Sequence, residues 1–112
     1  MNNILQNYTI LLICLICFGC VKHPDYIETV QNKASSYQGV TIKKYVEDLY
    51  KYTKAAGGNV VSGGWTYQSS ANGHIVKYNV EEYGKDISFV WVVDDSGNVR
   101  PQNDMAEKAT GR

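Results

Sequence analysis

The stretch that decides the fold runs from Trp65 to Val93 and reads WTYQSSANGHIVKYNVEEYGKDISFVWVV. Apolar and polar residues alternate through much of it with a period of two, which is typical of strands that bury one face. Two short segments, Asn72-Gly73 and Gly84-Lys85, separate the alternating runs. Asn-Gly strongly favours a two-residue hairpin turn, and glycine supplies the positive φ that the second turn needs. The sequence therefore predicts three consecutive antiparallel strands.

The two predicted turns determine how the strands pair. The first sets Ala71 opposite His74, and the second sets Tyr83 opposite Asp86. One face of the sheet then carries three rows of side chains: Trp65–Val80–Phe89, Tyr67–Tyr78–Trp91 and Ser69–Val76–Val93. The opposite face collects Thr66, Asn79 and Val90, then Gln68, Lys77 and Val92. Because a slip of one residue would mix the two sets, their separation predicts an aromatic inner face and a more polar outer face.

Shorter signals flank these strands. Gly63 and Gly64 predict a bulge in the first strand, or a close approach of a helix to the sheet. The run 94–98 predicts a turn, and Val99-Arg100 predicts a short fourth strand before Pro101. Asn103 or Asp104 is expected to cap one last helical turn, from Met105 to Lys108.

Two helices are predicted ahead of the strands. His23-Pro24 begins the first, whose apolar positions are Tyr26, Ile27, Val30 and Ala34. Thr41 caps the second, Gly57-Gly58 ends it, and one apolar stripe runs along it: Ile42, Tyr45, Val46, Leu49, Tyr50 and Thr53. We therefore expect an α+β fold in which two N-terminal helices pack on a three- to four-stranded antiparallel β-meander.

Length and charge limit the classes of protein to which the chain can belong. Its 112 residues carry 11 basic and 11 acidic side chains, and all of these lie beyond residue 20. Such a balanced surface argues against nucleic-acid binding, which needs a basic patch on the protein. It also argues against a polybasic attachment to anionic lipid. We expect residues 20–112 to form a single small domain.

The N-terminal segment predicts where the protein resides. Tyr8 to Gly19 is a run of 12 uncharged, mostly apolar residues. That length suits the apolar core of a signal peptide, whereas a membrane-spanning helix needs about 20 such residues. The run ends in Gly19-Cys20, and a small residue directly before cysteine resembles the lipobox of bacterial lipoproteins. The resemblance implies that residues 1–19 are a signal peptide cleaved between Gly19 and Cys20, and that lipid on Cys20 anchors the domain in the cell envelope.

Two other interpretations of this segment stay open. Ile4 to Val21 is just long enough to be an uncleaved membrane anchor, and the segment is also compatible with ordinary secretion. All three place the chain beyond Lys22 outside the cytoplasm. The three cysteines, Cys14, Cys17 and Cys20, all fall in or next to the apolar run. Their spacing resembles the start of an iron–sulfur motif, but the apolar setting and the missing fourth cysteine argue against a cluster.

The sequence carries no recognisable catalytic set, so we expect no enzymatic activity, no metal and no cofactor. The two histidines, His23 and His74, lie in no motif, and His74 is expected to be a surface residue beside a turn. Asp94, Ser96 and Asn98 have the alternate spacing of a calcium loop. The glycine and glutamate that such a loop requires are replaced by Val99 and Met105, so a plain turn is favoured.

Three hypotheses for function remain. The first is a non-enzymatic envelope lipoprotein that binds or scaffolds a partner. The second is a module for glycans or cell-wall fragments that uses tyrosines not needed by the predicted core, namely Tyr37, Tyr52 and Tyr83. The third is an inhibitor or immunity-type protein.

Val90 and Val92, two residues apart on the outer face, form a candidate contact strip. An envelope protein, a second copy of the chain or the first helix would cover it if it is not plain surface.

Overall fold

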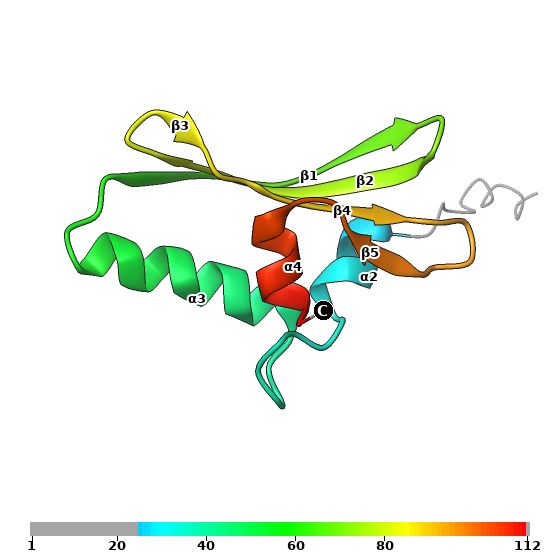
Figure 1. The fold of residues 1–112 in the computed structure, drawn as a ribbon, viewed down its shortest axis with the longest axis horizontal. Coiled ribbons are helices and arrows are strands. Elements are labelled where there is room, and N and C mark those ends of the chain that lie inside the picture. Colours follow the sequence, from blue (N-terminus) through cyan, green and yellow to red (C-terminus); the bar gives the residue numbers. More distant parts are fainter. Residues whose placement is uncertain (1–24, 112) are drawn as a thin grey trace, which may run out of the picture.

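The computed structural model describes residues 25–111, which form one antiparallel sheet with helices against one of its faces (Figure 1). The elements in chain order are α2 (Tyr26–Gln31), α3 (Ile42–Ala55), β1 (Val60–Ser70), β2 (Gly73–Glu82), β3 (Lys85–Asp86), β4 (Phe89–Val93), β5 (Val99–Pro101) and α4 (Asp104–Thr110). The strands lie in the order β1-β2-β4-β5, and β3 pairs with β2 as well. The predicted signal peptide, with Gly19 and Cys20, lies outside the described residues.

The α+β class and the antiparallel sheet are confirmed, but two details of the predicted fold are wrong. The sheet has five strands, because Lys85–Asp86 pairs with β2 before the chain continues into β4. The helices are not all N-terminal, because α4 follows the sheet and packs on it. The sequence indicated a single turn there, yet Ala106 and Ala109 are fully buried and Gly111 ends the helix in the left-handed conformation. Two small residues on one helix face gave little apolar signal.

Both hairpin turns lie one position earlier than predicted. The first loop is Ala71-Asn72, with Ser70 opposite Gly73, and the second is Tyr83-Gly84, with Glu82 opposite Lys85. Each shift moves the strand pairing by two residues. Because side chains alternate with a period of two, every residue keeps its predicted face while its cross-strand partner changes. The observed rows are Trp65–Tyr78–Phe89 and Tyr67–Val76–Trp91.

Local contacts explain the second shift. Tyr83 has φ +52° and Gly84 has φ +79°. Positive φ at both central residues is the conformation that a tight hairpin turn requires. Tyr83 is not a residue type that favours this region. Its N–H donates to the carbonyl of Asn59, at 2.9 Å, which holds the turn against the start of β1.

The bulge predicted at Gly63 and Gly64 is confirmed. Ser62 pairs with Val80 and Gly64 pairs with Asn79, so one extra residue of β1 lies between these pairs. Gly64 has φ +81°, a conformation that glycine adopts without strain. The extra residue reverses the alternation at the start of β1. As a result Val60 points into the core while Val61 is exposed.

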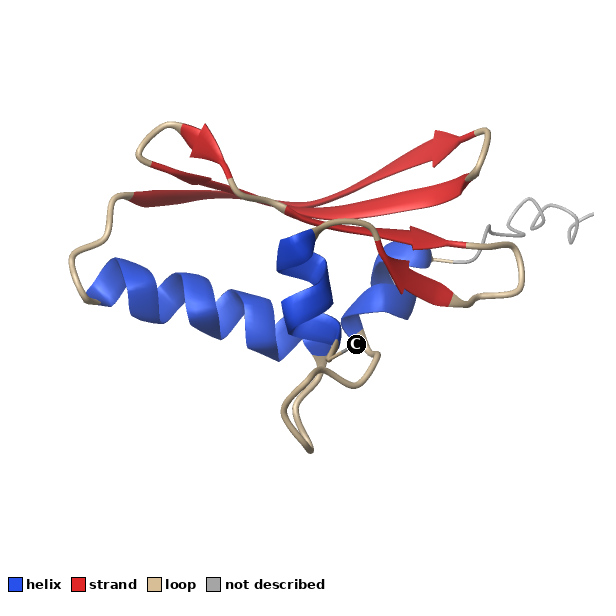
Figure 2. Cartoon of the chain, in the orientation of Figure 1, coloured by secondary structure: helices blue, strands red, loops and turns tan. Residues whose placement is uncertain are grey.

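The core lies between the inner face of the sheet and the three helices, which all lie on the same side of it (Figure 2). Six of the nine predicted inner-face residues are buried, namely Val76, Tyr78, Val80, Phe89, Trp91 and Val93, whereas Trp65 is half-buried and Tyr67 and Ser69 are exposed. The helices add Val30 from α2, Ile42 and Val46 from α3, and Ala106 and Ala109 from α4. The Trp91 side chain is fully buried and stacks on Phe89 and Trp65, at centroid distances of 6.0 and 5.8 Å. Its Nε1 donates to Thr110 Oγ1 at 2.9 Å, which ties α4 to the sheet.

Candidate functional site

The face of the sheet opposite the helices is the candidate site. Among residues 25–111, α2, α3 and α4 all pack on the inner face, which leaves the outer face uncovered (Figure 2). The first helix therefore does not cover the predicted contact strip, since its Val30 belongs to the core cluster on the other side.

The two valines of the contact strip differ in exposure. Val90 is half-buried, whereas Val92 is 6% exposed. The cross-strand neighbours of Val92 are Ile75 and Arg100, and the Gly73 backbone lies so close that a Cβ there would stand 3.1 Å from Val92 Cγ1. Val92 therefore offers a partner little area, and Val90 is the more accessible residue of the pair.

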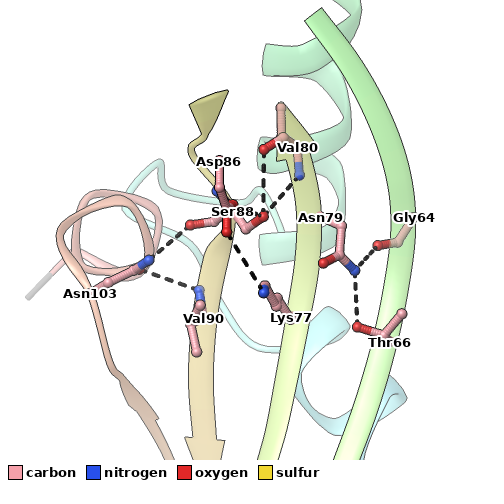
Figure 3. Close-up of polar contacts among 9 residues, drawn as sticks. All are labelled: Gly64, Thr66, Lys77, Asn79, Val80, Asp86, Ser88, Val90 and Asn103. Carbon is pink, nitrogen blue, oxygen red and sulfur yellow. Dashed lines mark hydrogen bonds and ion pairs between the residues drawn. The ribbon is translucent and has the colours of Figure 1, made fainter. Parts of the chain in front are cut away.

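A polar network adjoins Val90, as Figure 3 shows. At its centre the Ser88 hydroxyl donates to Asp86 Oδ1 at 2.5 Å and accepts the N–H of Val80 at 3.1 Å. The same Asp86 oxygen accepts the Ser88 N–H at 2.9 Å. Ser88 lies between β3 and β4, where its side chain takes the place of a main-chain acceptor for β2. Because Ser88 is buried and its hydroxyl is engaged in these bonds, we assign it a structural role.

The network fixes one negative charge on the outer face. The Ser88 hydroxyl, and after it the Ser88 N–H, hold the pKa of Asp86 below its ordinary value, and the nearby Lys77 ammonium contributes less. Lys77 Nζ lies 3.9 Å from Asp86 Oδ2, and the Asp86 side chain is 66% exposed. Lys77 is also the direct cross-strand neighbour of Val90. An accessible valine thus lies beside one exposed carboxylate and one partly exposed ammonium group.

Two asparagine amides join this face to the rest of the fold. Asn79 Nδ2 donates to the Gly64 carbonyl at 3.0 Å and to Thr66 Oγ1 at 2.9 Å, which braces the bulge of β1 (Figure 3). Asn103 Oδ1 accepts the N–H groups of Ala106 and Val90, and its Nδ2 donates to the Ser88 carbonyl. The sequence identified Asn103 as a candidate cap for α4. Its bonds to β4 depend on tertiary placement and left no signal in the sequence.

Two shallow hollows meet at Asp86 and Ser88 on this face. The first, about 270 Å³, is lined by Val61, Gly63, Asn79, Val80, Glu81, Asp86 and Ser88. The second, about 350 Å³, is lined by Lys77, Asp86, Ile87, Ser88, Val90, Asn103, Asp104 and Met105. Their exposed groups are carboxylates, an ammonium and short apolar side chains. Such a mixture suits recognition of a protein surface, in which an apolar centre is surrounded by polar groups.

The inner side of the sheet has a third, apolar cleft of about 170 Å³ between α3, the sheet and α4. Its lining residues are Val46, Leu49, Tyr50, Thr53, Val60, Val80, Glu82, Ile87, Phe89 and Met105. Leu49, predicted as part of the core stripe of α3, lies at its mouth and is exposed. Most of the lining belongs to the core or packs against it, so the cleft is an extension of the core toward solvent.

His74 lies in a cluster that the sequence did not predict. Its ring stacks on Tyr26 at a centroid distance of 3.8 Å. Nδ1 lies 2.9 Å from the Tyr67 hydroxyl, and Nε2 lies 2.8 Å from Asp95 Oδ1. The residue does lie beside a turn, as expected, but its side chain is largely covered. Both ring nitrogens have partners, so the cluster links α2, the first hairpin and the β4–β5 turn.

The turn at 94–98 uses its oxygens internally. Asp94 Oδ1 accepts the N–H groups of Ser96 and Asn98, and Oδ2 accepts Asn98 Nδ2. These bonds, above all those from Asn98, lower the pKa of Asp94. The spacing that resembled a calcium loop is therefore a turn stabilised by its own aspartate. Within residues 25–111 no group of three or more His, Cys, Asp or Glu side chains is arranged to hold a metal ion.

The three tyrosines proposed for glycan binding are exposed, but they come from separate segments. Tyr37, in the loop before α3, is 66% exposed and lies against Tyr45. Tyr52 is near the end of α3, and Tyr83 is in the second hairpin turn. A helix of 14 residues such as α3 is about 21 Å long. Because Tyr37 and Tyr52 lie near opposite ends of it, the three rings do not form one stacking platform.

No protein-family model, curated protein or solved structure matches the chain. No helix in the described part of the chain is long and apolar enough to cross a membrane.

Proposed function

We propose that the chain is a small lipid-anchored protein of the bacterial cell envelope that binds a protein partner and catalyses no reaction. The Gly19-Cys20 junction at the end of an apolar run supports the anchor. The uncovered outer face of the sheet supports the binding role, and this is the observation that carries the proposal (Figure 2). The part of this face that we propose contacts the partner is Val90 with Lys77 and Asp86.

The chemistry of this face favours a protein over a glycan as the partner. Val90 supplies a small apolar contact, and the opposite charges of Lys77 and Asp86 flank it. Protein interfaces combine an apolar centre with a polar rim, whereas sugars are bound mainly by stacking on aromatic rings. The aromatic rings of the sheet lie on the inner face, packed against the helices.

The proposed anchor also restricts how the domain sits on a membrane. Asp25, which caps α2, is five residues beyond Cys20. A stretch of that length spans at most roughly 17 Å. Tyr26 stacks on His74 at the start of β2, so the end of the sheet with the first hairpin would lie nearest the bilayer. The outer face would then stand along the side of the domain, accessible to a neighbour in the envelope.

The anchor is tested by changing Cys20 to Ala in the full chain. We expect the unsubstituted protein to begin at a diacylated Cys20 when its N-terminus is analysed by mass spectrometry. The variant should remain an unprocessed precursor, because alanine lacks the sulfur that receives the lipid before the signal peptide is cleaved. Stable anchoring takes two acyl chains, at ~0.8 kcal/mol per buried CH₂. An unmodified protein that begins at Met1 in membranes would contradict the lipid anchor and favour an uncleaved one.

The binding role is tested by a photo-crosslinking amino acid placed at Val90 in the full chain, in native membranes. A discrete cross-linked product should form from this position. Lys54, exposed on α3, is the control position, and no such product should form there. Equal products from both positions, or none from either, would contradict a binding surface on the outer face.

A further inference from the structure

The two edges of the sheet are built differently. At one edge, β5 has three residues and ends in Pro101, which has no N–H group to offer. Its middle residue, Arg100, is charged, and the N–H of the following Gln102 is already bonded to the Val90 carbonyl at 2.8 Å. Shortness, charge and proline are the features by which natural proteins keep a sheet edge from pairing with another strand.

The other edge has almost none of these features. β1 is 11 residues long, reads VVSGGWTYQSS, and contains no charged residue and no proline. Within the described residues it pairs with β2 alone, and Thr66 to Ser69 are exposed. Its one irregularity is the bulge between Ser62 and Gly64. Beyond the bulge an unbroken segment, 64–70, extends for about 24 Å at ~3.4 Å per residue.

We propose that this edge is the surface through which two copies of the chain associate, with β1 pairing antiparallel to β1 of the second copy. Every second residue of an edge strand directs its N–H and C=O groups away from its neighbour in the sheet. A second β1 satisfies these groups. Because neither strand carries a charge, their approach brings no like charges together in the pairing.

Among the described residues, β1 is the long and uncharged edge strand, whereas the other edge strands, β3 and β5, are short and charged, which favours β1 of a second copy as the occupant. Antiparallel pairing of two identical strands is two-fold symmetric, so each copy uses the same surface and the contact closes on itself. The β5 edge, protected as described above, cannot extend the sheet further. The association therefore stops at two copies. Tyr67, 45% exposed on β1, adds apolar area that the partner strand covers.

The symmetry of the dimer determines which surfaces the two copies together expose to other molecules. A two-fold axis perpendicular to the sheet places both helix layers on one side and both outer faces on the other. The two copies of Val90 then lie on one continuous surface. Pairing of one strand from each copy buries an area at the small end of known interfaces, below about 1,200 Å². We therefore expect a weak, concentration-dependent dimer that is favoured when the chains share a membrane surface.

The test is sedimentation of the full chain in detergent matched in density to the buffer, over a range of concentrations. We expect the protein mass to rise toward twice that of one chain. Gln68→Lys places a charge in the middle of the edge and should raise the dissociation constant at least tenfold. Gln102→Lys is the matched control beside β5, and it should leave the dissociation constant unchanged. A chain that stays monomeric up to about 1 mM, or two variants with equal effects, would overturn the proposal.

Hydrogen exchange supplies a second readout that needs no variant. The outward-facing amides of β1 should exchange slowly where the dimer is populated and quickly on dilution, while the amides of β4 do not change. If the dimer forms and β1 exchange is independent of concentration, the association uses another surface and the proposal is wrong. The outcome is independent of whether a partner binds the outer face.

Discussion

The two faces of the sheet are formed by the same strands but are stabilised in different ways. On the inner face, Phe89, Trp91 and Val93 of β4 belong to a buried cluster that the three helices cover. On the outer face Val90 lies beside Lys77, close to a network that runs from Asp86 through Ser88 to Asn103. The inner face is held by packing, which tolerates no gaps. The outer face is held by directed hydrogen bonds, most of which involve the backbone, so its exposed groups remain available for contacts.

This difference predicts where substitutions will be costly. On the inner face, loss of volume leaves a cavity that the surrounding residues cannot fill. On the outer face, the cost depends on whether a side chain bonds the backbone or simply faces solvent. The following substitutions test the comparison, beginning with the largest expected effect.

Trp91→Ala should lower the free energy of unfolding by about 3–5 kcal/mol, since Trp91 is fully buried and stacks on two rings. Denaturant unfolding monitored by circular dichroism measures the change. Tyr52→Ala, on the exposed side of α3, is the control and should shift the free energy by less than about 0.5 kcal/mol. A loss below about 1 kcal/mol for Trp91→Ala would mean that the aromatic face is not the core.

Asn103→Ala should cost about 2 kcal/mol, because it removes the cap of α4 and leaves the Ser88 carbonyl without its amide partner. Asn103→Asp is the informative comparison. Aspartate still accepts the N–H groups of Ala106 and Val90 but cannot donate to Ser88, so its cost should be smaller. If Asn103→Asp unfolds at the same denaturant concentration as the unsubstituted chain, the bond to Ser88 contributes nothing; if it unfolds together with Asn103→Ala, the cap contributes nothing.

Val92→Lys and Val90→Lys should differ although the residues lie two positions apart. Val92 is nearly covered by its neighbours, so a charge there should destabilise the fold by about 1–3 kcal/mol. Val90→Lys should change the free energy of unfolding by less than about 0.5 kcal/mol. Thermal unfolding of the two variants side by side measures this contrast. Equal destabilisation would mean that Val90 is also packed, and the accessible surface would then be smaller than described.

The smallest effect concerns acid stability. Asp86 and Asp94 each accept hydrogen bonds that lower the pKa in the folded state. Their contribution is therefore fully present above the unfolded-state pKa of about 3.9, and it is lost as the pH falls through the folded-state pKa. Asp86 is exposed and Asp94 lies half-buried in a surface turn, so the contribution is modest. Asp86→Asn and Asp94→Asn should each flatten the fall in stability between about pH 5 and pH 2. If the stability of both variants falls with acid as steeply as that of the unsubstituted chain, Asp86 and Asp94 do not contribute to stability in this way.

The sequence predicted the faces of the sheet better than its pairs. Alternation assigned Tyr78, Phe89 and Trp91 to the inner face, and a pairing error of two residues leaves that assignment intact. Alternation alone could not locate the turns. Asn72-Gly73 is a strong turn signal, yet it placed the first loop one position too late. At the second turn, the positive φ of Tyr83 accompanies a hydrogen bond to Asn59, which is distant in sequence. Tertiary contacts of this kind leave no local pattern.

The candidate site was predicted only as a strip of two valines. Burial of Val92 depends on the close approach of Gly73, and the network around Ser88 depends on residues that are up to 15 positions apart in sequence. Short polar side chains such as Ser88 and Asn103 carry no periodic signal. The open edge, by contrast, is visible in the composition of β1, which lacks charge and proline throughout. The sequence alone did not identify that strand as an edge, because edge position is set by the order of the whole sheet.

The most direct test of the central claim, that the outer face binds a partner while the inner face holds the fold, is maleimide labelling of a Val90→Cys variant. The purified protein should label readily at this position, because Val90 is accessible on an uncovered face. In native membranes the labelling should fall at least several-fold, since the partner covers the residue. Tyr52→Cys should label equally in both settings, with the unsubstituted chain as the background. Equal labelling of Val90→Cys in purified protein and in membranes would show that nothing occupies the outer face, and it would contradict the account.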